Sequence, residues 1–340
     1  MAQIAILGTG MIGTSIGLAL KNNSNVTVEK IIGYDRDKNN MRVAKKIGAV
    51  DDIEGDLRKA IKDASIIILA APVLSNHLLL EEISVFIDSG TVVTDTGSTK
   101  NATLMHALDC LPAGVDFIGS HPMAGTTGVG PAHADKNLFK DQIWIITAPA
   151  NVKAQSVNAI FHLAEGLGAK PMIMDAEEHD AYVAAISHAP MVISQALFKL
   201  MRSSEAWPEL SVLAAEGFKS VTRLSGTDPS MSFDILKTNR DQIIHWINRY
   251  ITELDTLRHN LEDFEDEDLF RLIAQIELDY SVFMDGASGR KEKSNMESTG
   301  SDLGALLIGH AMKDKIDEMT RGSEERVQEK DLARRMRREI

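Results

Sequence analysis

The sequence predicts an α/β protein in which a doubly wound, mostly parallel sheet is followed by an all-helical domain. Short apolar runs alternate with segments of helical spacing over the first half of the chain, and from residue 175 to Phe283 the spacing is helical throughout. Strands that are apolar on both faces and alternate with helices are typical of a parallel sheet covered by helices on each side. Strands are predicted over 3–7, 30–34, 65–70, 91–94, 116–118, 143–146 and 170–174, with helices over segments such as 11–21 and 38–47.

Composition limits the class of protein. The chain has 340 residues, of which 44% are apolar, so two packed domains are expected. No uninterrupted apolar run reaches the ~18 residues of a membrane span, and no basic stretch precedes the first strand, so neither a membrane segment nor a signal peptide is expected. A single cysteine, Cys110, excludes an internal disulfide and a cysteine-cluster metal site, which predicts a cytoplasmic protein. The net charge of −13 argues against binding to nucleic acid.

A glycine pattern directly after the first strand predicts a dinucleotide site. In "ILGTGMIGTSIGLAL", Gly8 allows a tight turn, Gly10 allows pyrophosphate to approach the backbone, and Gly13 allows close packing of helix on strand. Met11 and Ile12 open the helix whose N–H groups and dipole would hold the anion. The first domain is therefore predicted to be of the Rossmann type and to extend over residues 1–170.

The next strand ends in an acidic residue at the spacing that a ribose contact needs. Asp35 follows "IIGY" and favours NAD, because a carboxylate repels a 2′-phosphate. Arg36 beside it keeps NADP as the alternative, since a guanidinium binds such a phosphate.

Three further loops are predicted at the same edge of the sheet. "LAAP" includes Ala71 and Pro72, "TDTGSTKN" includes Ser98, and "GSHPMAGTTGVG" includes His121. The glycine and proline content of the last stretch predicts a loop around His121. Because ligands in open α/β sheets bind outside the carboxyl ends of the strands, Ser98 and His121 are expected near the nicotinamide.

The second half is predicted to form a helical domain over 171–285, followed by a polar tail over 286–340. Asp175 is placed as an N-cap with Glu178 three residues later, and the many apolar helices favour a homodimer. His188 precedes Pro190, which should interrupt the helix, so His188 is read either as a site residue or as a core histidine. His179, in the first helical turn, is expected at the surface. The tail is interpreted as poorly ordered or, alternatively, as a helix that binds a partner.

Together these motifs resemble the prephenate dehydrogenase family, which includes the arogenate dehydrogenases. The matching segments are "GTGMIGTSIGLAL", "DTGSTK", "GSHPMAG", "HDAYVAAISHAP" and "GFKSVTRLSGTDPSMSFDI", in the family's order over about residues 1–283. The resemblance implies a nucleotide-binding domain, a helical dimerisation domain, and oxidation of prephenate by NAD(P)+ with loss of CO2, with no metal. It also implies that His121 accepts a hydrogen bond from the substrate hydroxyl, that Ser98 orients this histidine, and that Arg223 binds a substrate carboxylate.

The sequence departs from the family pattern at three positions. Met191 stands where many relatives carry a second histidine, and Thr127 and Ser220 stand where relatives tend to carry acids. The absence of both acids predicts a less gated entrance to the site, with Thr127 near the substrate and an altered preference between prephenate and arogenate. A catalytically inactive NAD-binding regulator is the alternative from another class of protein, but it would be expected to lack His121 or Ser98.

Overall fold

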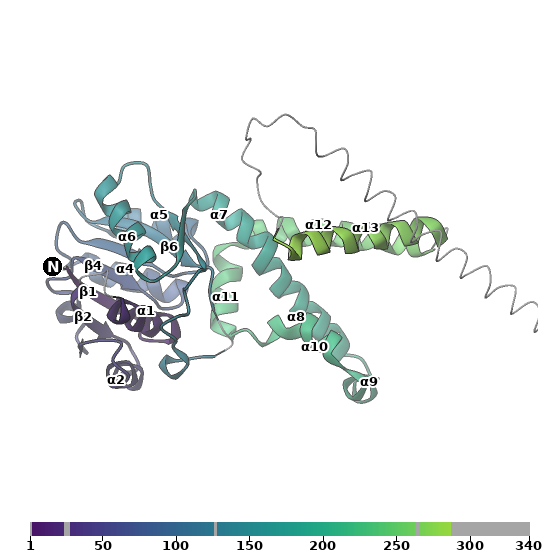
Figure 1. Cartoon of the computed structure of the whole chain (residues 1–340), viewed down its shortest axis with the longest axis horizontal. Helices are drawn as coiled ribbons and strands as arrows, with labels where there is room; N and C mark the ends of the chain where they lie inside the picture. The colour runs from purple at the N-terminus through teal and green to yellow at the C-terminus, as the bar shows by residue number, and fades with distance from the viewer. Residues whose placement is uncertain (1, 24–27, 126–127, 263–265, 287–340) are drawn as a thin grey trace, which may run out of the picture. The chain divides into compact units, whose positions relative to one another are not determined.

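The computed structural model describes residues 2–23, 28–125, 128–262 and 266–286 (Figure 1). By its internal contacts the chain divides into two compact units, Met1–His259 and Asn260–Ile340. The first unit contains the whole sheet and the helices that follow it up to most of α12. The predicted tail over 286–340 lies, apart from residue 286, outside the described residues.

The sheet of the described chain has eight strands in the order β3-β2-β1-β4-β5-β6-β7-β8, which confirms the doubly wound α/β prediction. The seven predicted strands are present, and the two-residue β3 was missed because so short a run has no readable pattern. The strands are β1 (Ala2–Leu7), β2 (Val28–Tyr34), β3 (Asp52–Ile53), β4 (Ile66–Leu69), β5 (Val92–Asp95), β6 (Asp116–Pro122), β7 (Ile143–Thr147) and β8 (Lys170–Ile173).

Neighbouring strands run parallel except β6 and β7, which are antiparallel. This pair corrects one prediction. His121 lies on strand β6 opposite Ile145 rather than in a loop, because pairing with β7 extends β6 as far as Pro122. The glycine and proline content of residues 119–122 predicted a loop, but pairing with β7 gives this segment backbone hydrogen-bond partners. His121 is therefore held on a rigid element.

Helices cover both faces of the sheet (Figure 1). Alternate residues of each strand point to opposite faces, so Ile4 and Ile6 pack with one set of helices and Ala5 and Leu7 with the other. The first set contributes apolar side chains from α1 (Met11–Asn22), α2 (Lys38–Lys46) and α6 (Ala154–Gly166). The second contributes them from α3 (Leu57–Ile61), α4 (Val73–Ser84) and α5 (Asn101–Cys110).

Beyond β8 every described element is helical, as predicted. Asp175 caps α7 by accepting hydrogen bonds from the N–H groups of Glu177 and Glu178. The helices are α7 (Ala176–Val183), α8 (Ala189–Arg202), α9 (Trp207–Leu213), α10 (Glu216–Thr222), α11 (Pro229–Thr238), α12 (Arg240–Glu262) and α13 (Asp266–Met284).

A π-helical turn joins α7 to α8 at Ala184–His188. The N–H of Ala189 reaches back to the carbonyl of Ala184, which widens the turn directly before Pro190. The predicted interruption is therefore a π-bulge, a feature found frequently at functional sites.

The continuous run Ala176–Arg202 is the one helix among the described residues that is long and apolar enough to span a membrane. This statement concerns only length and composition, which the core helix of a soluble protein can share.

Candidate active site

The glycine turn between β1 and α1 has the geometry that a pyrophosphate needs. Gly8 has φ +106°, and a Cβ there would lie 2.6 Å from the carbonyl oxygen of Ala70. A Cβ on Gly13 would lie 2.0 Å from the carbonyl oxygen of Gly8, so the helix packs directly on the turn. A Cβ on Gly10 would meet no atom within 4 Å, which leaves the space above the turn open to a ligand. Gly8 and Gly13 thus show the tight turn and the close packing that their positions predict, and Gly10 leaves the space that a pyrophosphate would need.

Asp35 closes the second side of this turn. Its Oδ2 accepts hydrogen bonds from the N–H of Thr9 at 2.7 Å and from the Thr9 hydroxyl at 3.2 Å, and its Oδ1 accepts from the N–H of Asp37 at 2.8 Å. The carboxylate is therefore fixed in place and keeps lone pairs for a ribose. Arg36 is exposed beside it.

The segment containing Ala71 and Pro72 is held by a residue that sequence reasoning missed. Asn76, fully buried in α4, accepts from the N–H of Ala71 at 3.2 Å and donates to the carbonyl of Leu69 at 3.4 Å. Pro72 is the N-cap residue of α4. An asparagine four residues after a proline at a helix start was the available signal.

The turn after β5 is fixed by a buried ion pair. The Lys100 ammonium donates to the Asp95 carboxylate and, at 2.6 Å, to the carbonyl of Ser120, and neither charged side chain is exposed. Asp95 also accepts from the N–H of Ser120 at 3.1 Å and from that of Gly97 at 2.9 Å. These bonds join the turn that carries Ser98 to the strand residue directly before His121.

His121 belongs to a hydrogen-bonded chain of three side chains. Its Nδ1 lies 2.9 Å from Nε2 of His179, and Nδ1 of His179 lies 2.8 Å from Oδ1 of Asp180. The N–H groups of Lys100 and Asn101 donate to the two oxygens of Asp180 at 2.8 and 2.9 Å. His179 is fully buried, so its expected surface position was wrong: α7 packs this face against the turn before α5.

Ser98 does not join this chain. Over the described part of the chain, no hydrogen bond links Ser98 to His121, and the ring nitrogen Nδ1 has His179 as its partner instead. Ser98 is half-buried in the turn between β5 and α5, at the same edge of the sheet.

A second histidine lies in the same region. His188 is buried, and its Nδ1 lies 3.1 Å from Nδ2 of Asn239, which also donates to the carbonyl of Asp180 at 2.8 Å. Its Nε2 has no hydrogen-bond partner among the described residues. A buried polar atom without a partner is costly, so a ligand group that accepts this hydrogen bond is expected here.

Both histidines are held in the neutral form. Burial, together with the neighbouring His179, Lys100 and His188, lowers the pKa of His121 well below its ordinary value, although part of its surface stays accessible. Burial lowers the pKa of His188 to about 4, against the opposing effect of Asp180. A neutral imidazole offers one donor and one acceptor, so both rings can serve as hydrogen-bonding partners at neutral pH.

Helix α11 is hydrogen-bonded to two segments at this edge of the sheet. Asp234 of α11 accepts from the N–H of Leu74 at 2.9 Å, and the Thr238 hydroxyl lies 2.8 Å from that of Thr99. α11 is thereby bonded both to the start of α4 and to the turn that carries Ser98.

Comparison with known proteins identifies the family. A model described as prephenate dehydrogenase, nucleotide-binding domain, matches residues 16–173, and one described as prephenate dehydrogenase, dimerization domain, matches residues 175–275. The chain belongs to the prephenate dehydrogenase family. It is 35% identical to a prephenate dehydrogenase of Bacillus subtilis (strain 168) over 79% of this chain and 72% of the relative. It is also 29% identical to a cyclohexadienyl dehydrogenase of Zymomonas mobilis over 75% and 87% of the two chains.

Solved structures agree with the fold. A prephenate dehydrogenase from A. aeolicus, solved with hydroxyphenyl propionate and NAD+, superposes with a TM-score of 0.77 at 24% identity over 83% of this chain and 98% of that one. A Synechocystis arogenate dehydrogenase gives 0.71 at 26% identity over 83% and 99%. The family thus includes enzymes named for either cyclohexadienyl substrate.

Among the described residues, no hydrogen bond links Arg223 to His121, His179 or His188. Arg223 begins a 3₁₀ turn after α10 and is exposed. Its backbone N–H donates to the carbonyl of Ser220, and its guanidinium has no hydrogen bond or ion pair with any other described residue. Met191 is buried and accepts a bond from the Ser232 hydroxyl at its sulfur at 3.6 Å. Ser220 is exposed on α10 and donates to Glu216 at 3.1 Å. Thr127 lies outside the described residues.

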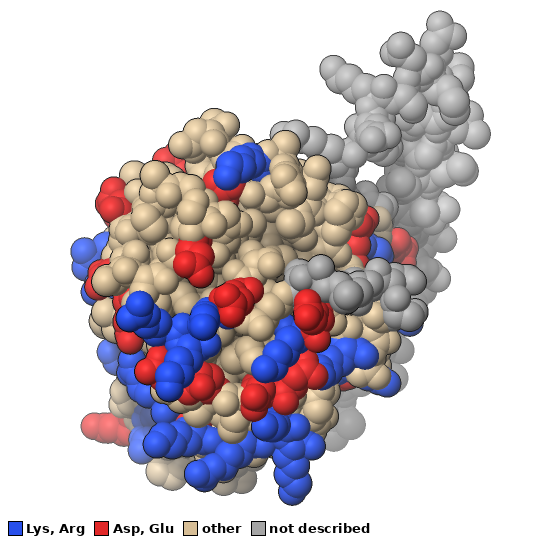
Figure 2. All heavy atoms as spheres, turned by 90° about the vertical axis from the view of Figure 1, so that its left-hand side faces the viewer, with Lys and Arg blue, Asp and Glu red and all other residues tan. Residues whose placement is uncertain are grey.

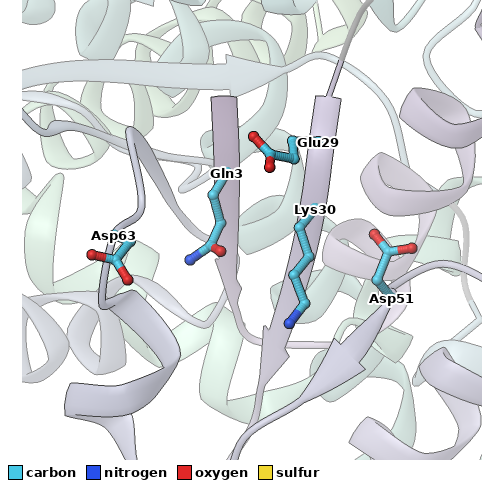
Figure 3. A pocket seen from close by; sticks show the side chains of 5 residues that line it. All are labelled: Gln3, Glu29, Lys30, Asp51 and Asp63. Carbon is cyan, nitrogen blue, oxygen red and sulfur yellow. The ribbon is translucent and has the colours of Figure 1, made fainter. Parts of the chain in front are cut away.

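The opposite, amino-terminal edge of the sheet carries a separate hollow of about 490 Å³ (Figure 3). Gln3 and Lys30 line it from β1 and β2, and Asp51 accepts hydrogen bonds there from Lys21 and from the N–H of Ile31. On this face basic and acidic side chains are intermingled rather than gathered by sign (Figure 2). Neither observation connects the hollow with the histidine cluster, which comprises His121, His179, Asp180 and His188.

Proposed function

We propose that the chain is an NAD-dependent prephenate dehydrogenase that converts prephenate to 4-hydroxyphenylpyruvate and CO2. One observation carries the proposal. A neutral histidine, His121, stands at the carboxyl edge of a nucleotide-binding sheet, and its Nε2 has no partner among the described residues. An imidazole so placed can accept the proton of a substrate hydroxyl.

The cofactor fits the glycine turn. The open space above Gly10 would receive the pyrophosphate at the start of α1, and the fixed carboxylate of Asp35 would accept hydrogen bonds from the adenosine ribose hydroxyls. We infer NAD rather than NADP, because Asp35 would repel a 2′-phosphate, with Arg36 supporting the alternative. When bound, the nicotinamide supplies the acceptor for the hydride.

His121 then takes up one proton from the substrate and returns it to the product. As the C–H bond of the carbinol carbon breaks and its electron pair leaves with the hydride, the hydroxyl proton moves to Nε2 of His121. Cleavage of the ring carbon–carboxylate bond releases CO2, and its electron pair completes the aromatic ring and leaves the oxygen as phenolate. His121 returns its proton to that oxygen, so the reaction needs no net proton from solvent.

The substrate is a dianion in an acidic protein, so cations and donors must hold its carboxylates. Arg223, a guanidinium without a protein partner among the described residues, is assigned to one carboxylate. His188 is assigned to donate from Nε2 to a second anionic or carbonyl oxygen, because that atom is buried and has no described protein partner.

The test is NADH absorbance with purified protein, NAD+ or NADP+, and either prephenate or arogenate. We expect the fastest reduction with prephenate and NAD+. Faster turnover of arogenate would assign the chain to the other named activity of the family, and no reduction with either substrate would exclude an enzyme of this class.

We also propose that the chain works as a homodimer, because the matched dimerization domain exposes large apolar side chains. Leu200, Leu213, Phe233 and Ile244 are between 49% and 78% exposed on α8–α12. Light scattering should give twice the 37.2 kDa chain mass, and a mass of one chain would refute the proposal.

A further inference from the structure

The directions of the hydrogen bonds around Asp180 follow from the donors that surround it. Two backbone N–H groups, those of Lys100 and Asn101, donate to the carboxylate, which as an anion only accepts. The bond between Asp180 and Nδ1 of His179 therefore has the histidine as donor. A neutral imidazole carries one ring proton, and in His179 the bond to Asp180 places that proton on Nδ1, so Nε2 of the neutral ring is left as an acceptor.

This assignment passes to the next ring. Because Nε2 of His179 accepts, Nδ1 of His121 at 2.9 Å must donate. The single proton of a neutral His121 is then on Nδ1, and its Nε2 presents a lone pair. A base at this position needs that lone pair.

The same residue sets the second histidine in the opposite way. The main-chain carbonyl of Asp180 fixes the amide of Asn239 with its NH2 group toward both that carbonyl and His188. Nδ1 of His188 must accept, so its proton is on Nε2, the atom without a described partner. Asp180 thus prepares one ring as an acceptor and the other as a donor.

We propose that His179 is a positioning residue that, together with Asp180, holds His121 in the tautomer with a bare Nε2. The catalytic consequence rests on the proposed function, whereas the tautomer itself does not. When Nε2 takes the hydroxyl proton, His121 becomes an imidazolium whose Nδ1–H still donates to His179, and the Asp180 carboxylate stabilises the added charge through that ring. The charge is transient, because the proton returns to the product oxygen.

The direct test reads the ring protons of the unliganded protein. The protein is labelled with ¹⁵N at histidine, and long-range ¹H–¹⁵N spectra above pH 7 show which nitrogen of each neutral ring carries hydrogen. The signals of His121 are assigned from their loss in His121→Asn. We expect the proton on Nδ1; a proton on Nε2, as a charged His179 would impose, would overturn the proposal.

Two variants separate positioning from packing. His179→Leu removes the acceptor, and we expect a mixture of His121 tautomers and a fall in kcat of about 10²–10³-fold with KM changed less than about threefold. His179→Gln keeps an amide oxygen at about the reach of the imidazole Nε2, so it should restore the Nδ1–H tautomer and recover about tenfold or more of the lost kcat. A role in packing alone predicts an unchanged tautomer.

The controls keep the outcomes distinct. His162→Gln, at a ring whose side chain is 75% exposed, should leave kcat and the His121 spectrum unchanged. If His179→Leu fails to fold, the wild-type spectrum and His179→Gln still decide the question. If wild type reduces no cofactor with either substrate, the proposed function fails while the spectrum continues to test the tautomer. A kcat for His179→Leu within about threefold of wild type would remove His179 from its role.

Discussion

The glycine turn and the histidine cluster are built at the same edge of one sheet, yet the chain specifies them differently. Gly8, Gly10 and Gly13 lie within six consecutive residues, and the nearest atoms to a Cβ on Gly8 or Gly13 are backbone atoms. The histidine cluster joins β6 to α7 across 58 residues between His121 and His179, and α7 to the start of α5 across 80 residues between Asp180 and Lys100.

The two regions are also proposed to act on a ligand in different ways. The turn provides space and N–H groups and has no titrating side chain of its own. The cluster provides directed protons, and each ring's role depends on a neighbour brought from elsewhere in the chain. Damage to the turn should therefore weaken binding, whereas damage to the cluster should slow turnover.

The largest separation between the two regions is expected from His121→Asn. An asparagine amide cannot take up the hydroxyl proton, so kcat should fall by about 10²–10⁴-fold. Because the glycine turn is untouched, the dissociation constant for NAD+ should stay within about twofold of wild type. Steady-state NADH absorbance and NAD+ titration by fluorescence measure the two quantities.

The matched control is His106→Asn, on α5 and outside the cluster, where both quantities should remain at wild-type values. A His121→Asn enzyme with near-normal kcat would show that another group takes the proton. A parallel loss of NAD+ affinity would show that the two regions are not separate.

What could be predicted from the sequence follows the same division. The turn was predictable residue by residue, since the glycine spacing and Asp35 carry their geometry in local sequence. The position of His121 on β6 and the burial of His179 were not, because both depend on partners that are distant in sequence. A glycine- and proline-containing run becomes a strand only because β7 lies beside it.

The polar partners in the core illustrate the same limit. His179 in a first helical turn has the pattern of an exposed residue, and only the packing of α7 on the turn before α5 buries it. Asn239 carries no motif, and Asn76 is marked in the sequence only by its position four residues after Pro72. Their roles follow from the buried carbonyl groups and ring nitrogens that they satisfy.

A second test uses the acid sensitivity that only the cluster should confer. His188 has a pKa of about 4 in the folded chain against 6.5 as its ordinary value. Between pH 6.5 and pH 4 the unfolded chain binds a proton at this ring and the folded chain does not. The contribution of the neutral ring to the free energy of unfolding is therefore fully present above pH 6.5 and is lost as the pH falls to 4. The free energy of unfolding should fall by roughly 1.4 kcal/mol per pH unit from this group, about 3 kcal/mol in all.

Urea unfolding at pH 7 and pH 5 of wild type and His188→Gln measures this. The variant should lose about 2 kcal/mol less than wild type between the two values, since it lacks the titrating ring. The exposed-site variant His162→Gln should retain the wild-type slope. Equal slopes in wild type and His188→Gln would mean that His188 titrates normally in the folded protein.

The smallest effect is expected at the turn, from Gly10→Ala. Gly10 has ordinary φ and ψ of −71° and −162°, and the added methyl group meets no protein atom within 4 Å, so the unfolding free energy should be unchanged. The same methyl group occupies the space that the pyrophosphate needs. Loss of one charge-assisted hydrogen bond, about 1.5–3 kcal/mol, would raise the NAD+ dissociation constant by about tenfold or more.

Gly217→Ala, on α10 and equally open, is the matched control and should leave NAD+ affinity unchanged. At saturating NAD+ the Gly10→Ala enzyme should keep kcat, because the proton is managed by His121 and its partners alone. A fall in kcat at saturation would mean that the turn also aligns the reacting groups, and the division between binding and turnover would no longer hold.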